Sequence, residues 1–163
     1  MRKLTTTLCL TVAVLFGSMG MSESADFQKG LNAYQSGNYA TALREWTPLA
    51  KQGNAVAQTI LGLMHVNGKG VSQDYKTAVK WFRLAADQGN ARAQTNLGVM
   101  YGMGKGVIQD DVYAHMWGHL ATSNGNENGA KVRALAARRI TLSQLEKAQK
   151  LARECVRKKY KGC

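Results

Sequence analysis

Residues 55–90 read "AVAQTILGLMHVNGKGVSQDYKTAVKWFRLAADQGN", and residues 91–126 read "ARAQTNLGVMYGMGKGVIQDDVYAHMWGHLATSNGN". With residue 91 set against residue 55, the two stretches align without a gap at an offset of 36 residues. The identical pairs include Ala57/Ala93, Gln58/Gln94, Leu61/Leu97, Gly62/Gly98, Met64/Met100, Ala78/Ala114, Trp81/Trp117, Leu84/Leu120 and Gly89/Gly125. Agreement over this length at one fixed offset indicates an internal repeat, the sign of a fold built by stacking similar units.

Each unit is predicted to contain two helices. Apolar and small residues at helical spacing predict the first helix over residues 55–66. Asp74 is a good N-cap for the second helix, and Gly89 is expected to end it. The face of the second helix that is expected to be buried carries Ala78, Trp81, Leu84 and Ala85. Trp46, Trp81 and Trp117 are all expected in the core.

The segment between the two helices reads Gly-Lys-Gly around Lys69 and again around Lys105. A phosphate-binding P-loop needs a strand before it and a Gly-Lys-Ser/Thr that leads directly into a helix. Here a predicted helix precedes the segment and glycine follows the lysine. We therefore interpret the segment as the long turn between paired helices rather than as a nucleotide site.

A shorter copy occupies residues 27–54, where Gly53-Asn54 aligns with Gly89-Asn90. The pattern A-x-A-Q-x-x-L-G-x-M-Y…G-x-G-V-x-x-D…A-x-x-W…A-A-x-x-G resembles the Sel1-like repeat, a relative of the tetratricopeptide repeat. The resemblance covers residues 27–126 and implies an all-α fold, a right-handed α/α solenoid. Residues 25–126 are thus expected to hold three repeats, over residues 27–54, 55–90 and 91–126.

The resemblance also implies where a partner would bind, because the first helix of each pair would line the concave face. Counting from Gly30, Gly62 and Gly98 as the family's helix glycine gives the candidate binding positions. They are Phe27, Leu31, Tyr34, Thr59, Leu63, Val66, Thr95 and Val99. The third copy has Gly102 at the last of these positions, so Arg92, about one turn before Thr95, is added. This mixture of apolar and small side chains suits an extended peptide or a partner helix. The alternative is that some of these residues only pack between helices.

The start of the chain has the features of a secretory signal. Arg2 and Lys3 precede the apolar run "LCLTVAVLF" over residues 8–16, and small residues follow it. We expect residues 1–24 to be a cleaved signal peptide, and the protein to be periplasmic or secreted. An uncleaved N-terminal anchor is the alternative.

Residues 127–163 depart from the repeat and are predicted to form a pair of capping helices. Val132, Leu135 and Ala136 are expected to face inward from the first, and Leu145, Ala148, Leu151, Ala152 and Val156 from the second. Thr141 and Gln144 form a capping box between them. From residue 130 onward, eleven Lys and Arg face two Glu, a net charge of +9 within the chain's total of +12. This basic surface could contact anionic lipid, a cell-wall polymer or an acidic protein, or it could be a solvated helix face.

Two cysteines, Cys155 and Cys163, follow the predicted signal peptide. Export makes a disulfide between them possible, provided that the last helix ends near Tyr160 and lets the tail fold back. Two free thiols or a bridge to another chain remain as alternatives.

The weakest candidate site is a stripe of Asp111, His115 and His119 on one predicted helix, where two imidazoles at i, i+4 could share a metal ion. A polar stripe without metal is the alternative, and no catalytic set or cofactor motif is present in the sequence. We therefore expect a non-enzymatic module of the cell envelope that binds a protein or peptide and uses no cofactor. A metal-binding protein or hydrolase built on this stripe, or attachment to anionic envelope polymers, are the alternative functions. Nucleic acid is not an expected partner, and the protein is expected to be a monomer or weak dimer.

Overall fold

The computed structural model describes residues 24–163, and every regular element in that range is a helix. The predicted signal peptide, residues 1–24, therefore lies outside the described residues except for its last position. Residues 24–35 are helical, and the further helices are α2 (Tyr39–Lys51), α3 (Ala55–Asn67), α4 (Tyr75–Ala86), α5 (Ala91–Met103), α6 (Asp111–Ser123), α7 (Glu127–Ala137) and α8 (Leu142–Arg157). Within residues 24–163, no helix combines the length and the apolar character that crossing a membrane requires.

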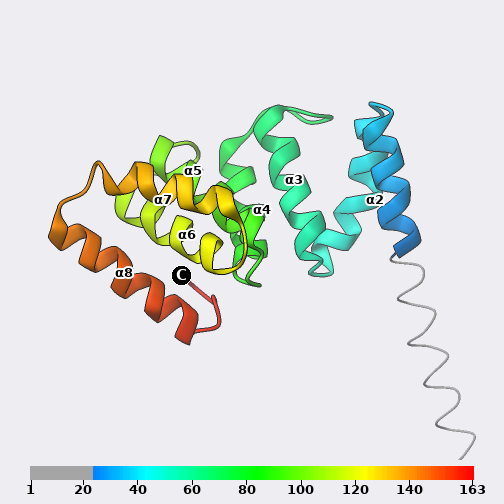
Figure 1. The fold of residues 1–163 in the computed structure, drawn as a ribbon. Coiled ribbons are helices and arrows are strands. Elements are labelled where there is room, and N and C mark those ends of the chain that lie inside the picture. The colour runs from blue at the N-terminus through cyan, green and yellow to red at the C-terminus, as the bar shows by residue number, and fades with distance from the viewer. Residues whose placement is uncertain (1–23) are drawn as a thin grey trace, which may run out of the picture.

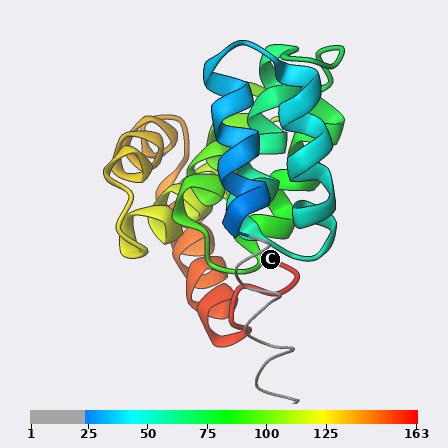
Figure 2. The same ribbon diagram turned by 90° about the vertical axis from the view of Figure 1, so that its right-hand side faces the viewer.

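The helices stack in consecutive pairs, which confirms the predicted all-α repeat architecture. The helix over residues 24–35 pairs with α2, α3 with α4, and α5 with α6, and each pair lies beside the next (Figure 1). Seen along the stack, the first pair lies in front, while α7 projects to one side and α8 runs below (Figure 2). This arrangement buries the apolar face of each pair against its neighbour, as stacked repeats require.

The same residue types start and end equivalent helices in successive repeats. Asn54, Asn90 and Asn126 are the N-caps of α3, α5 and α7, and Asp74 and Asp110 are those of α4 and α6. Each cap side chain accepts hydrogen bonds from backbone N–H groups of the first turn, which have no other partner within the helix. These caps explain why the predicted starts of the second helices are correct.

The Gly-Lys-Gly turns are packing elements. Gly68 and Gly104 end α3 and α5 in the left-handed region, with φ values of 65° and 64°. Each turn then places its lysine against the preceding repeat: Lys69 Nζ lies 5.2 Å from the centre of the Tyr39 ring, and Lys105 Nζ lies 5.1 Å from that of Tyr75. Since the two tyrosines are also one repeat apart, this cation–π contact recurs along the stack.

Glycines in the first helices receive aromatic rings from the second helices. A Cβ on Gly30 would lie 2.7 Å from Cε2 of Trp46, and a Cβ on Gly62 would lie 2.6 Å from Cδ1 of Phe82. Trp46 and Phe82 occupy the same repeat position, and both are almost fully buried. In the third repeat that position is Gly118, which leaves room for another helix instead of a ring.

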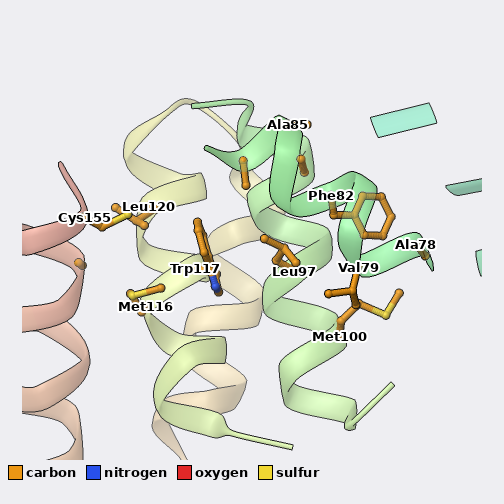
Figure 3. Close-up of a cluster of buried hydrophobic side chains, with 13 residues drawn as sticks. Ala78, Val79, Phe82, Ala85, Leu97, Met100, Met116, Trp117, Leu120 and Cys155 are labelled. Atoms are coloured by element: carbon orange, nitrogen blue, oxygen red, sulfur yellow. The ribbon is translucent and has the colours of Figure 1, made fainter. Parts of the chain in front are cut away.

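The predicted buried face of α4 is partly wrong. Ala78 and Ala85 are buried, but Leu84 is 49% exposed and Trp81 is only partly buried, against the core of the preceding repeat. Phe82 fills the core in their place, because its ring packs into the space that Gly62 leaves by having no Cβ. Figure 3 shows Phe82 on α4 in the same core as Trp117 and Leu120 of α6. Leu120, the counterpart of Leu84, is fully buried because α8 also covers α6.

The C-terminal helices do not form the expected pair. Both α7 and α8 pack on α6, whereas contact between α7 and α8 is marginal (Figure 1). Gly118 of α6 and Gly129 of α7 allow the two backbones to touch, since a Cβ on Gly129 would lie 2.7 Å from the Gly118 carbonyl oxygen. Leu135 and Val156, which were predicted to face inward, are 56% and 51% exposed. The divergence of the two helices leaves these side chains without a partner helix to cover them.

Candidate functional site

The three predicted binding residues of the first helix pack inward. Phe27, Leu31 and Tyr34 are partly buried against the core of the first repeat. The Phe27 carbonyl accepts a hydrogen bond from Nε1 of Trp46 at 3.1 Å, and the Tyr34 hydroxyl is 3.0 Å from Lys69 Nζ. Their contacts show a structural role, and whether they also contact a partner stays a prediction.

The prediction that Thr59 and Thr95 lie on the binding surface is wrong. They are 3% and 8% exposed, and their hydroxyls donate to the carbonyls of Ala55 and Ala91 in the preceding turn of the same helix. Threonine commonly satisfies its hydroxyl in this way when it is buried in a helix. Neither side chain is available to a partner.

The remaining predicted positions differ in accessibility. Leu63 and Val66 of α3 are partly buried and pack against the larger core cluster, while Arg92 is exposed at the start of α5. Val99 also lies on α5, but it opens onto a pocket. Val99 therefore lies at a hollow on the surface.

That hollow, the α5–α7 pocket, lies between α5, α6 and α7. It has a volume of about 130 Å³ and is lined by Gly98, Val99, Gly102, Met103, Asp111, Ala114, Val132, Leu135, Ala136 and Arg139. The volume is close to that of an apolar cavity of ~150 Å³ that binds benzene. Met103 is 61% exposed and Leu135 is 56% exposed, so apolar side chains surround the opening. The pocket can receive one aliphatic or aromatic side chain.

A single ion pair provides most of the polar character of the pocket. Arg139 Nη1 lies 3.5 Å from Asp111 Oδ1 and donates to the Gly102 carbonyl at 3.2 Å. The arginine side chain is 55% exposed and the aspartate side chain 16% exposed. Arg139, which follows α7, therefore connects the end of that helix to α5 and α6 across the pocket. Part of its guanidinium group remains exposed to solvent.

The contact between Asp111 and Arg139 also involves one residue of the predicted metal site, the stripe of Asp111, His115 and His119. His115 is 5% exposed and His119 is partly buried, and within residues 24–163 no three His, Cys, Asp or Glu side chains gather in a geometry that could hold a metal ion. The stripe of Asp111, His115 and His119 is thus wrong as a three-ligand site. Residues at i, i+4 and i+8 lie at successively different angles around a helix. Asp111, the first of the three, contacts Arg139 at the end of α7.

A buried polar network joins successive repeats, and our sequence reasoning missed it. Nε2 of Gln58 donates to the carbonyl of Ala50 at 2.9 Å, while its Oε1 accepts from Nε2 of Gln88 at 2.8 Å. One repeat later, Gln94 joins the Ala86 carbonyl to Nδ2 of Asn124 in the same way. The signal was a glutamine repeated at the same position in an apolar helix, since such a residue needs buried partners.

The C-terminal tail folds back onto this network. Cys155, within α8, and Cys163 form a disulfide, with Cα atoms 5.4 Å apart. The chain can fold back to make this bond because α8 ends at Arg157. The hydroxyl of Tyr160 donates to Oδ1 of Asn124 at 2.9 Å, and its ring packs on Gly89. The disulfide thus closes a short loop that rests against the junction between the second and third repeats.

The basic C-terminal charge gathers around two histidines of α6. Burial lowers the pKa of His115, and His119 and Arg133 lower it further. Burial likewise lowers the pKa of His119, with added repulsion from Arg133 and Arg153. Because Arg133 lies on α7 and Arg153 on α8, cations from both C-terminal helices act on the same face of α6.

Comparison with known proteins agrees with the boundaries of the second and third predicted repeats. The Sel1 repeat family model matches residues 55–90 and 91–126. No curated protein matches this sequence.

Two solved structures are similar to the fold. One is a protective antigen present in uropathogenic Escherichia coli strains, which displays an SLR fold. Its TM-score is 0.79 at 30% sequence identity, and the match covers 85% of this chain and 30% of that one. The other is a Sel1 repeat protein from Oxalobacter formigenes, with a TM-score of 0.62, 29% identity, and coverage of 65% of this chain and 44% of that one. This chain therefore spans less than half the length of either structure.

Proposed function

Since this chain is a Sel1 repeat protein, we propose that it works as a non-catalytic scaffold that binds a partner protein at the α5–α7 pocket. Sel1 repeats typically form protein-binding scaffolds and are generally not catalytic. The proposal adds a location and a kind of ligand: an apolar side chain of the partner that enters the pocket beside Val99.

The observation that carries the proposal is the apolar pocket at the end of the regular stack. Gly102 leaves space along α5, and Met103 and Leu135 remain more than half exposed beside the pocket. Exposed apolar side chains around a hollow of this kind favour contact with another protein, because burying them releases ordered water. A residue that fills a pocket in this way often contributes most of the binding energy.

We also propose that the protein acts outside the cytoplasm. The apolar run near the N-terminus resembles a signal peptide, and the Cys155–Cys163 disulfide suits an oxidising compartment. A similar protein of known structure is described as a protective antigen. The mass of protein purified from the envelope fraction would test this point, since cleavage removes residues 1 to about 24.

Co-purification from envelope extract tests the scaffold function. Met103→Glu combined with Leu135→Glu places two carboxylates at the opening of the pocket, which should prevent an apolar side chain from entering. We expect a partner that co-purifies with the native protein to be depleted at least tenfold with this variant.

Ile108→Glu is the matched control, since Ile108 is 90% exposed and does not line the pocket. It should retain the partner, and the partner should then bind the purified native protein directly. Equal recovery of all proteins with the native chain and the pocket variant would refute the proposed site.

A further inference from the structure

A second surface, distinct from the α5–α7 pocket, lies where α8 crosses α6. This basic hollow is an open space of about 590 Å³ between His119 of α6 and the α8 residues Lys150, Ala152, Arg153, Val156 and Arg157. In Figure 1, α7 and α8 lie on different sides of α6, and the residues that line the hollow come from α6 and α8.

Two cations that act on His119 are not neutralised by the protein itself: Arg153, in the wall of the basic hollow, and Arg133, which lies on α7 outside its lining. Within residues 24–163, neither Arg133 nor Arg153 lies within ion-pair distance of a carboxylate. Glu154 also lines the hollow, but its nearest cation is Arg157, at 3.9 Å. Burial is the first cause of the lowered pKa of both histidines, and repulsion from these cations lowers it further, since uncompensated positive charge disfavours adding another. A bound carboxylate would neutralise this uncompensated positive charge.

The wall of the basic hollow is apolar as well as charged. The half-exposed Val156 lies between Arg153 and Arg157 on α8, and the buried Ala152 lies just before Arg153. The long stems of Lys150, Arg153 and Arg157 add aliphatic surface below their charged ends. A purely hydrophilic polyanion would leave this apolar area unused, whereas a peptide that alternates apolar and acidic side chains would cover it.

We propose that the basic hollow binds an acidic segment of a partner protein, with an apolar side chain against Val156 and carboxylates on Arg153 and Arg157, while Arg133 adds positive charge from α7, outside the lining. Guanidinium groups suit this ligand because they can pair with a carboxylate through two parallel hydrogen bonds. The inference rests on the proposed scaffold function in one respect only, that the ligand belongs to a protein. The hollow and the α5–α7 pocket would then contact different parts of a partner.

A peptide titration with the purified, disulfide-bonded protein tests this inference. The probe is a fluorescent twelve-residue peptide of glutamate and leucine, and fluorescence anisotropy reports its binding. Arg133→Gln combined with Arg153→Gln should weaken binding by about tenfold or more, the effect expected from losing charge-assisted hydrogen bonds. Raising the salt concentration should weaken the binding of the native protein, because exposed charges are screened.

Lys51→Gln combined with Lys80→Gln is the matched control, since it removes the same charge from exposed positions of α2 and α4. It should bind the peptide as the native protein does. The Met103→Glu and Leu135→Glu variant should also retain binding, so the hollow can be tested even if the proposed pocket is wrong. If the Arg133 variant does not fold, Arg153→Gln with Arg157→Gln, both exposed on α8, replaces it.

Three results would overturn the inference. The first is the absence of saturable peptide binding, and the second is an equal loss in the arginine and lysine variants, which would reflect net charge alone. The third is tighter, arginine-dependent binding of inorganic polyphosphate than of the peptide, which would assign the hollow to anionic polymers.

Discussion

At the scale of single residues, close fits between glycine and aromatic side chains hold each helix pair together. Gly62 accepts the ring of Phe82, and Gly30 accepts that of Trp46. Glycine in a helix costs about 0.5–1 kcal/mol relative to alanine, so its presence at both positions needs a compensating contact. The buried ring provides that contact in each case.

Replacing Gly62 by alanine should therefore destabilise the protein. The new methyl group would overlap the Phe82 ring, and overpacking of this kind costs about 1–3 kcal/mol of unfolding free energy. Urea denaturation would measure the change. Gly102→Ala is the control, because its Cβ would meet nothing closer than Ala114 Cβ at 3.6 Å, so it should be neutral or stabilising. Equal effects of the two changes would contradict the account.

The histidines of α6 should make stability depend on pH. Their pKa values in the folded protein are lowered, by burial first and then by neighbouring positive groups. Unfolded histidine takes up a proton near its ordinary pKa of about 6.5. As the pH falls below that value, the unfolded state binds more protons than the folded state, and stability is lost.

His115→Asn combined with His119→Asn should reduce the loss of unfolding free energy between pH 7 and pH 5. Urea midpoints at the two pH values measure this, with His65→Asn in α3 as the control. An undiminished loss in the double variant would show that other groups cause the acid sensitivity.

Single residues were only partly predictable from the sequence. Val99 was identified by its register in the repeat, but Leu135 and Arg139 complete the pocket across a helix contact that no repeat position encodes. Thr59 and Thr95 share the periodicity of surface residues, yet a hydrogen bond within the helix allows them to be buried. Which face a small polar residue takes depends on neighbours that periodicity alone does not show.

At the scale of helices, the sequence predicted the repeated elements better than the C-terminal ones. Asparagine and aspartate caps recur at a constant offset, so the beginnings of α3, α4, α5 and α6 could be read directly. The arrangement of α7 relative to α8 could not be predicted from the sequence, because it depends on the close approach of Gly118 and Gly129. Amphipathic patterns alone predicted a pair of helices, whereas each helix packs on α6.

The disulfide-closed tail is expected to stabilise the last repeats. Cys163→Ser opens the loop, and a loop of this length corresponds to about 2–3 kcal/mol of unfolding free energy in the chain-entropy model. Urea denaturation of the oxidised protein and the variant measures the difference. Tyr160→Phe, which removes only the hydrogen bond to Asn124, should cost about 1 kcal/mol. An unchanged midpoint for Cys163→Ser would mean that the tail contributes nothing to stability.

At the scale of the whole molecule, the regular stack ends at α6, and both candidate surfaces lie there. The α5–α7 pocket is apolar and lies beside α7, whereas the basic hollow lies between α6 and α8. The earlier repeats carry little net charge, and the positive charge belongs to the helices that close the stack. Under the two proposals, the first repeats have structural roles and the C-terminal end contacts the partner.

Site-specific photo-crosslinking in the envelope tests the central claim most directly. A photoreactive residue in place of Leu135, on the opening of the pocket, should give a covalent adduct of one defined mass with a partner protein. The same residue in place of Ile108, which is exposed outside the pocket, should not give that adduct. Identical adducts from both positions, or none from Leu135, would contradict the assignment of partner binding to the α5–α7 pocket.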